Sequence, residues 1–288
     1  MEQQRMNIQW YPGHMTKTRR QIEADLKQVD AVCEIVDARI PASSRNPDID
    51  SICAGKPRIV VLNRMDLADR EATKRWISFF REKGMAAVAT DCKSRKGIGE
   101  FEPAVRSVLK EKLERNAAKG MNRPVRVMIV GIPNVGKSTL INQISGRKGA
   151  KAENRPGVTR GKQWVTVNSG LLLLDTPGIL WPKFEDPEVG MMLAYTGAVK
   201  ENVIDTEELA YRLMELLWKY YPETVKSRYG VDMPQDTPGY VLLEEAGRKR
   251  GYLLAGAEVN TERMARVLLD EYRSGKLGRF TLEMPEDA

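Results

Sequence analysis

The sequence predicts a mixed α/β fold, in which a mostly parallel sheet with helices on both faces is followed by a small all-helical part. Two observations carry this prediction. Short apolar runs alternate with helical patterns over residues 1–182, and from residue 183 onward apolar residues recur only at helical spacing. Alternating strands and helices are typical of a doubly wound, mainly parallel sheet. We therefore predict two domains, residues 1–182 and 183–288.

Six runs in the first domain are predicted to be strands, because they are short and mostly apolar throughout, as expected when both faces of a sheet are covered. These runs span residues 31–38, 57–63, 85–90, 125–131, 163–167 and 171–175. Helical patterns lie near residues 15–29, 69–83, 99–119 and 137–145, and residues 119–124 are predicted to form a loop between two halves of the domain.

The second domain contains four amphipathic segments with helical spacing. They begin near Asp186, Thr206, Gly239 and Asn260. Most start with a capping residue followed closely by Glu, which is the pattern of helix N-termini. We expect a small helical domain that binds RNA.

Charge is distributed unevenly along the chain, whose net charge is +7. Residues 1–182 hold 32 Lys and Arg against 19 Asp and Glu, whereas residues 183–288 hold 14 against 20. A basic excess of this size favours a polyanionic partner such as RNA, although a merely solvated surface would also account for it.

Composition excludes several classes of protein. No run of about 18 apolar residues is present, and the first ten residues lack the apolar core of a secretory signal, so we expect neither a membrane span nor export. Cys33, Cys53 and Cys92 are scattered without a C-x-x-C pair. A disulfide framework or zinc site is therefore not expected, and the cytoplasm is the expected location.

The strongest motif is G-I-P-N-V-G-K-S at residues 131–138. It matches the phosphate-binding loop (P-loop) pattern G-x-x-x-x-G-K-[ST] and stands between a predicted strand and a predicted helix. Its backbone N–H groups and the helix N-terminus would face phosphate oxygens, Lys137 would reach the terminal phosphates, and the Ser138 hydroxyl would ligate Mg²⁺. The expected nucleotide contacts here are Asn134, Val135, Gly136, Lys137, Ser138 and Thr139.

A second motif, D-T-P-G at residues 175–178, follows the last apolar run. Asp175 at the strand end is expected to hold Mg²⁺, and the N–H of Gly178 to meet the γ-phosphate. Thr159, in the polar loop between the two motifs, is the candidate hydroxyl that reaches Mg²⁺ when the γ-phosphate is present. Lys137 and Thr159 are therefore counted among the catalytic residues.

A third motif predicts the base. Residues 60–66, V-V-L-N-R-M-D, end a strand with Asn63-x-x-Asp66, which resembles the N-K-x-D element of Ras-like GTPases. An aspartate accepts hydrogen bonds from N1–H and the 2-amino group of guanine, a pair that adenine lacks, which argues against a P-loop ATPase. Arg64 replaces the usual lysine, and its stem could still pack on the base. The N–H that meets guanine O6 is expected from Cys92 or Lys93.

The order of these motifs is unusual, because the base-recognition elements precede the P-loop. A circular permutation would build the same sheet, since domain termini often lie close together. The chain resembles the circularly permuted P-loop GTPases, and D-A-R-I-P-A-S-S-R-N-P at residues 37–47 is similar to their D-A-R-x-P segment. W-Y-P-G-H-M at residues 10–15 and the helical C-terminal part narrow the resemblance to bacterial assembly factors of the large ribosomal subunit.

The position after D-T-P-G is Ile179, where Ras-like GTPases carry the glutamine that orients the attacking water. Another group must then orient it. His14 is the only histidine of the chain, and the resemblance implies this role for it. A neutral imidazole can accept a hydrogen bond from water at physiological pH. An isolated surface histidine in a frayed terminus is the alternative.

The resemblance implies K⁺ as a further cofactor, held by Asn134 beside the phosphates. Basic residues near the N-terminal segment and the loop after the P-loop helix are candidate rRNA contacts, and A-G-R-K-R-G at residues 246–251 is a second candidate. They comprise Lys17, Arg19, Arg20, Arg147, Lys148, Lys151, Arg155, Arg160 and Lys162.

Together these features predict a monomeric, Mg²⁺-dependent GTPase that binds the immature large (50S) ribosomal subunit, promotes its late maturation and is stimulated by ribosomal subunits. The alternative is a GTP-controlled RNA-binding switch without significant intrinsic hydrolysis.

Overall fold

The computed structural model describes residues 13–146, 163–167, 170–178, 186–199 and 205–287, with only the backbone given for residues 13–19. The described residues fall into two compact units. One contains residues 13–178 together with 283–287 and is called the GTPase unit below. The other contains residues 186–282 and is called the helical unit. The predicted boundary between residues 182 and 183 lies outside the described residues.

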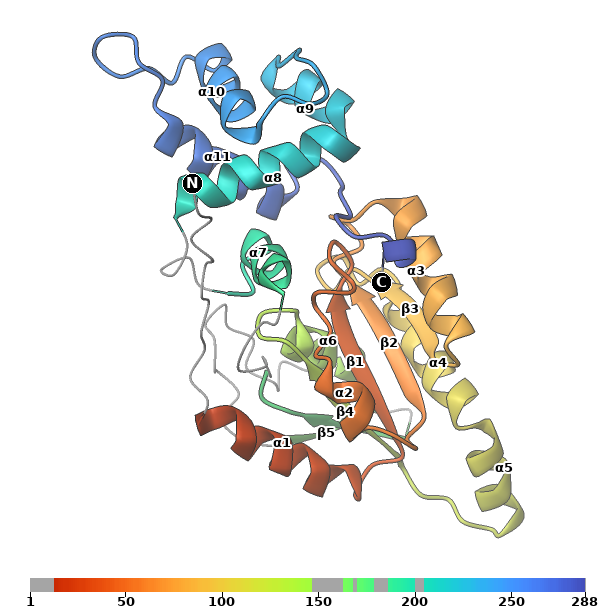
Figure 1. Ribbon diagram of the computed structural model, residues 1–288. Coiled ribbons are helices and arrows are strands. Elements are labelled where there is room, and N and C mark those ends of the chain that lie inside the picture. Colours follow the sequence, from red (N-terminus) through yellow and green to blue (C-terminus); the bar gives the residue numbers. More distant parts are fainter. Residues whose placement is uncertain (1–12, 147–162, 168–169, 179–185, 200–204, 288) are drawn as a thin grey trace. The chain divides into compact units, whose positions relative to one another are not determined.

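The GTPase unit contains a six-stranded sheet in the order β3-β2-β1-β4-β6-β5 (Figure 1). All neighbouring strands are parallel except β5 and β6, which are antiparallel. The predicted α/β fold with a mostly parallel sheet is thereby confirmed. The strands are β1 (Ala31–Asp37), β2 (Arg58–Asn63), β3 (Ala86–Thr90), β4 (Val125–Gly131), β5 (Gln163–Val167) and β6 (Leu171–Asp175).

Strand register aligns polar residues at one edge of the sheet. Asp37 of β1 is paired with Asn63 of β2, and Asn63 with Thr90 of β3. These are the carboxyl ends of parallel strands, where open α/β sheets bind their ligands. Every residue of β1 is buried, including the polar Glu34 and Asp37. Apolar burial thus fixes the strands, and their ends bring the polar side chains together.

Helices cover both faces of this sheet. Residues of α1, α2 and α3 pack against side chains such as Val32, Val36 and Leu62, whereas α4 and α6 lie behind the sheet in Figure 1. Asp69 begins α3 by accepting a hydrogen bond from the Ala72 N–H. The helices are α1 (Gly13–Leu26), α2 (Asp48–Ile52), α3 (Arg70–Glu82), α4 (Phe101–Val108), α5 (Lys110–Ala118) and α6 (Lys137–Ser145).

Three details differ from the sequence prediction, one of which is the helix at Pro222–Tyr229, which lies outside the four predicted helical segments. The pattern over residues 99–119 is a short 3₁₀ turn, η1 (Ile98–Glu100), followed by α4 and α5, which break at Leu109. The five-residue helix α2 was not predicted, because five residues are too few to show a helical period.

The helical unit contains α7 (Pro187–Tyr195), α8 (Thr206–Tyr220), α9 (Pro222–Tyr229), α10 (Gly239–Lys249) and α11 (Thr261–Ser274). Its core is apolar and includes Leu213, Leu242 and Leu268 from α8, α10 and α11. Asp186, Asp205 and Asn260 cap three of the helices with their side chains. Among the described residues, no helix is long and apolar enough to cross a membrane.

Candidate nucleotide-binding site

The P-loop connects β4 to α6 through two glycines that no larger residue could replace without strain. At Gly131 (φ 154°), a Cβ would lie 2.6 Å from the carbonyl oxygen of Ile35, and at Gly136 (φ 107°) it would lie 2.3 Å from Nδ2 of Asn63. Asn134 between them also has a positive φ of 59°. The loop therefore passes tightly over neighbouring strands with its backbone available for a ligand.

Lys137 is buried at the first position of α6, 7% exposed. Its Nζ donates to the carbonyl oxygens of Gly131 (3.0 Å) and Ile132 (2.8 Å). Burial lowers the pKa of Lys137 to about 8, although the negative charge of Asp175 opposes the shift. A buried ammonium held by the loop carbonyls is a preformed partner for an anionic ligand.

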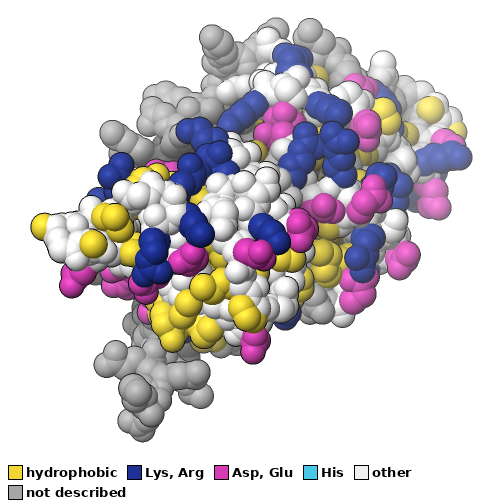
Figure 2. All heavy atoms as spheres, turned by 90° about the horizontal axis from the view of Figure 1, so that it is seen from above, with side chains coloured by type: hydrophobic (Ala, Val, Ile, Leu, Met, Phe, Trp, Pro, Cys, Tyr) yellow, Lys and Arg dark blue, Asp and Glu magenta, His cyan; other side chains and the backbone are white. Residues whose placement is uncertain are grey.

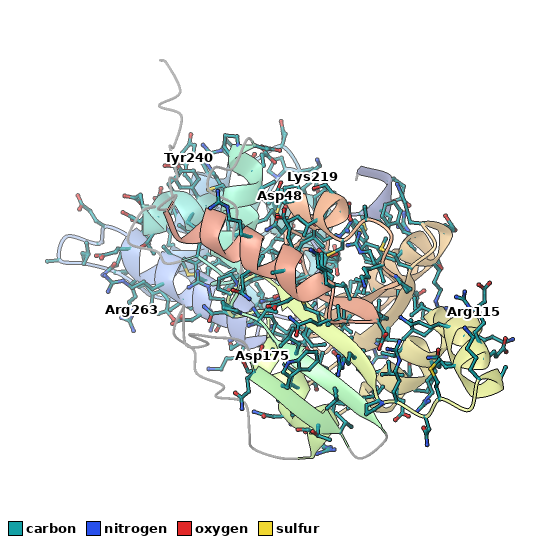
Figure 3. All side chains as sticks on the ribbon, turned by 90° about the horizontal axis from the view of Figure 1, so that it is seen from below. Asp48, Arg115, Asp175, Lys219, Tyr240 and Arg263 are labelled. Atoms are coloured by element: carbon teal, nitrogen blue, oxygen red, sulfur yellow. The ribbon has the colours of Figure 1, made fainter. Side chains whose placement is uncertain are left out.

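Ser138 and Asp175 meet beneath the P-loop. Ser138 Oγ donates to Asp175 Oδ2 at 3.2 Å. Asp175, labelled in Figure 3, is the last residue of β6, and its Oδ1 is buried without a hydrogen-bond partner among the described residues. Burial raises the pKa of this carboxyl above its ordinary value. A hydroxyl and an orphaned carboxylate oxygen fit Mg²⁺, a hard cation that prefers oxygen ligands.

Gly178 lies against the P-loop. A Cβ on Gly178 would lie 2.9 Å from the Pro133 backbone and 3.0 Å from Nζ of Lys137. Two residues earlier, Thr176 Oγ1 donates to the Ile129 carbonyl of β4 at 2.7 Å, which fixes the start of this segment. The structure thus brings Gly178 to the lysine predicted to hold the terminal phosphates.

Asn63 connects the third motif, at residues 60–66, to the P-loop. Its Nδ2 donates to the Val135 carbonyl at 2.8 Å, and its Oδ1 accepts from Thr90 Oγ1 at 3.2 Å. The side chain is buried, so its polar atoms hold β2 to the P-loop and to β3. The buried Asn63 side chain thus serves to fix the strand end from which the turn with Asp66 begins.

Arg64 also turns toward the P-loop. Its Nη2 donates to the Asn134 carbonyl at 2.7 Å, and its Nη1 lies 3.4 Å from Asp37 Oδ2. Burial opposes ionisation of Asp37, but the charges of Arg39 and Arg64 outweigh it and hold the pKa of Asp37 below its ordinary value. The guanidinium thus joins strands β1 and β2 to the phosphate loop.

Asp66 follows in a turn after β2. Among the described residues, its carboxylate has no hydrogen bond or ion pair. Its negative charge acts on the Cys92 thiol, whose pKa is raised to about 11 mainly by burial. Asp66 and Cys92 therefore share one neighbourhood, at the edge of the sheet where the base is expected.

The loop after β3 distinguishes Cys92 from Lys93. Asp91 Oδ1 accepts the Lys93 N–H at 2.8 Å, so that amide is already engaged. Gly97 (φ 77°) closes the loop, since a Cβ there would lie 2.0 Å from the Ala89 carbonyl oxygen. This geometry favours the Cys92 amide for guanine O6.

Several sequence-predicted features lie wholly or partly outside the described part of the chain. Among the candidate rRNA contacts, only the backbone is described for Lys17 and Arg19, and the following are not described: Arg147, Lys148, Lys151, Arg155, Arg160 and Lys162. Thr159 and Ile179 are not described. His14 stands in the first turn of α1, and nothing is described of its side chain. Of the other predicted nucleotide contacts, Val135 is buried in the P-loop, and Thr139 is half-buried on α6.

Sequence reasoning missed the role of the D-A-R segment. Asp37 ends a buried strand, accepts two hydrogen bonds from the Arg39 guanidinium at 2.9 and 2.8 Å, and faces Arg64. The sequence feature that could have revealed this role is the position of Asp37, a carboxylate at the end of an apolar strand, as Asp175 is on β6.

Comparisons with known proteins agree with this site. Residues 126–220 match the sequence family described as 50S ribosome-binding GTPase. Ribosome biogenesis GTPase A of Priestia megaterium is 47% identical over 286 residues, covering 98% of this chain and 99% of that protein. The Bacillus cereus protein of the same name is also 47% identical, over 284 residues, covering 98% and 95%. The structure of GDP-bound YlqF matches with TM-score 0.62 and 30% identity, covering 93% of this chain and 100% of that chain.

Proposed function

The chain belongs to the ribosome biogenesis GTPase A family, and from this we propose that it binds GTP with Mg²⁺, docks on the immature large (50S) ribosomal subunit, promotes its late maturation and leaves after hydrolysis. One observation carries the nucleotide part of the proposal. The P-loop, the Asn63–Asp66 turn and Asp175 converge at the carboxyl edge of one sheet, joined by the Asn63–Val135, Arg64–Asn134 and Ser138–Asp175 hydrogen bonds.

The phosphates are bound by charge and by backbone donors. Lys137 moves from the carbonyls that hold it to the β- and γ-phosphates, and the N-terminal amides of α6 face the same oxygens. Ser138 and Asp175 hold Mg²⁺, with Thr159 as a further ligand. When bound, Mg²⁺ would neutralise the negative charge that develops on the phosphate oxygens.

The base is recognised by Asp66 and the loop after β3. The Asp66 carboxylate accepts from N1–H and the 2-amino group of guanine, and the Cys92 amide donates to O6. Adenine lacks both the N1–H and 2-amino donors and the O6 acceptor of guanine, so this arrangement selects GTP over ATP.

Hydrolysis needs an oriented water and further positive charge. We assign the first role to His14, whose neutral imidazole accepts a hydrogen bond from the water, and γ-phosphate sensing to Thr159 and Gly178. K⁺ held by Asn134 would supply the charge that an arginine finger supplies in other GTPases. Asn134 fits this role, because its backbone is held beside the phosphate site by Arg64.

The GTPase unit is proposed to be a circular permutation of the Ras-like domain, in a cytoplasmic monomer. The rRNA contacts are proposed on the basic N-terminal two-thirds of the chain. Residues 246–251, the second candidate for an rRNA contact, are the weaker proposal, because their positive charges are paired. Arg248 pairs with Glu244 and Glu245, and Lys249 pairs with Glu245. In the view of Figure 2, basic and acidic side chains are interspersed in this way.

Cosedimentation with purified ribosomal subunits tests the proposal. We expect the protein to pellet with 50S and not 30S subunits when loaded with a non-hydrolysable GTP analogue, and to be released with GDP. Equal binding to both subunits, or binding that ignores the nucleotide, would overturn it. Release with GDP but no detectable phosphate formation from GTP would favour the RNA-binding switch without hydrolysis, which Ile179 supports.

A further inference from the structure

The side chain of Glu283, near the C-terminus, accepts hydrogen bonds from the loop that follows β1 and contains the D-A-R segment. Its Oε2 accepts the Ala42 N–H at 2.7 Å, and both carboxylate oxygens accept the Ser43 N–H at 3.1 Å. Burial raises the pKa of Glu283 above its ordinary value, although these donors oppose the shift, and the nearby charge of Asp37 raises it further. A carboxylate on two adjacent backbone amides is a strong, charge-assisted contact.

The backbone around Glu283 is held equally firmly. Trp76 Nε1 of α3 donates to the Glu283 carbonyl at 2.9 Å, and the short helix η3 (Pro285–Asp287) lies beside α3 (Figure 1). Two residues before Glu283, Thr281 exchanges hydrogen bonds with the Tyr221 hydroxyl inside the helical unit. The chain therefore leaves the helical unit at residue 282 and is anchored in the GTPase unit at residue 283.

The loop that Glu283 holds closes back on Asp37. Ser44, next to Ser43, donates Oγ to the Ile40 carbonyl at 2.7 Å and accepts the Asp37 N–H at 2.9 Å. Asp37, Ser43 and Ser44 are all buried. A displacement of Ser43 is therefore passed to the backbone that carries the Asp37 carboxylate.

From Asp37 the contacts continue to the phosphate loop. Asp37 faces Arg64, and Arg64 donates to the Asn134 carbonyl. Asn134 has a left-handed backbone conformation (φ 59°), which asparagine adopts more readily than other non-glycine residues, and the Arg64 guanidinium holds its carbonyl in this turn. Hydrogen bonds, the peptide link between Ser43 and Ser44 and the Asp37–Arg64 ion pair thus form one continuous route from Glu283 to the P-loop.

We propose that Glu283 is a positioning residue for the nucleotide site: by holding Ala42 and Ser43 it keeps Asp37 and Arg64 set against Asn134, so that a pull on the C-terminal segment from the helical unit changes nucleotide affinity. This rests on the proposed function, in which the P-loop of the GTPase unit binds a guanine nucleotide. Glu283 touches no nucleotide, and its effect comes entirely through the loop.

Fluorescence titration of GDP and a GTP analogue, well below the melting temperature, tests the proposal with Glu283→Gln. Glutamine keeps the size but loses the negative charge, and its NH₂ group replaces one of the two oxygens that accept the Ser43 N–H. We expect Kd to rise about threefold to tenfold, the range typical of changes along a coupling network. Glu286→Gln is the matched control, because Glu286 lies on the same segment and its ion pair is with the exposed Arg75 side chain. Its Kd should equal that of the wild type.

A double-mutant cycle with Asp37→Asn separates positioning from general destabilisation. If Glu283 acts through Asp37, the double variant binds no more weakly than Asp37→Asn alone, whereas additive losses would overturn the proposed route. Glu283→Asp, which keeps the charge with a shorter reach, should restore part of the affinity and covers the case in which Glu283→Gln fails to fold. Wild-type Kd values in both Glu283 variants would overturn this inference alone. A wild-type protein that binds no guanine nucleotide would overturn the proposed function together with it.

Discussion

Nδ2 of Asn63 donates a hydrogen bond of 2.8 Å to the carbonyl oxygen of Val135, which joins strand β2 to the P-loop across 72 residues of sequence. The second polar atom of the same amide accepts from Thr90. The Asn63 side chain thus links β2 to the P-loop and to β3. These two hydrogen bonds fix both the P-loop and the turn that carries Asp66.

Replacing Asn63 by Ala should weaken all nucleotides alike. The change removes the Asn63 side chain from the buried Val135 carbonyl, at a cost of about 1–3 kcal/mol, and leaves the Thr90 hydroxyl with the weak contact to Cys92 Sγ. It loosens the phosphate loop without touching the base. We expect a lower melting temperature and equal fold-losses for GDP and for the weak binding of ADP, measured by titration. A loss confined to GDP would show instead that Asn63 contacts guanine directly.

Replacing Asp66 by Asn should change base preference. An amide offers an NH₂ donor where the carboxylate only accepts, which suits the 2-carbonyl of xanthine and opposes the 2-amino group of guanine. We expect GDP affinity to fall about tenfold to a hundredfold, as for a lost charge-assisted pair, while xanthosine diphosphate affinity rises. Competition titration measures both. Asp69→Asn is the control, because it keeps the cap of α3 and should leave base preference unchanged.

The pH dependence of binding should follow Lys137. Burial sets its pKa near 8 in the free protein, and phosphate charge would raise it in the complex. Below this pH the lysine is already protonated. Above it, binding must take up a proton, so GDP affinity should fall by up to about tenfold per pH unit. Calorimetry at pH 7 to 9 in two buffers with different ionisation enthalpies would detect the uptake.

The matched control for this pH dependence is Lys137→Arg, since arginine stays charged throughout the range. Its affinity, whatever its absolute value, should be flat with pH. A wild-type affinity that is equally flat would contradict the assignment of Lys137 to the phosphates.

Asp175→Asn should remove the response to Mg²⁺. The amide keeps the shape but loses the charge that attracts the cation. With Mg²⁺ we expect the Kd for a GTP analogue to rise about tenfold relative to the wild type. A chelator should cause a similar rise in the wild type and little further change in the variant. Equal chelator effects on both proteins would place the metal elsewhere.

The sequence predicted the sheet well because its strands are buried on both faces. Each of the six predicted apolar runs is a strand, with ends that agree within one residue. The helix α2 was missed because its five residues are too few to show a helical period. Likewise, nothing in the local pattern shows where residues 99–119 break at Leu109.

The sequence predicted those site residues that belong to short, contiguous motifs. Lys137, Ser138 and Asp175 follow directly from two motifs and lie together as expected. The contacts of Arg64 with Asn134 and of Glu283 with Ala42 join residues 70 and 241 positions apart, and no periodicity encodes such pairs. They become visible only when strand order and register are known.

GTP turnover in potassium buffer, with and without purified large ribosomal subunits, tests the central claim most directly when wild type and His14→Ala are compared. The account predicts that subunits accelerate the wild type strongly and the variant hardly at all. Equal acceleration of both would remove His14 from the role of orienting water and leave the ribosomal assignment standing. A wild type whose turnover ignores the subunits would contradict the account.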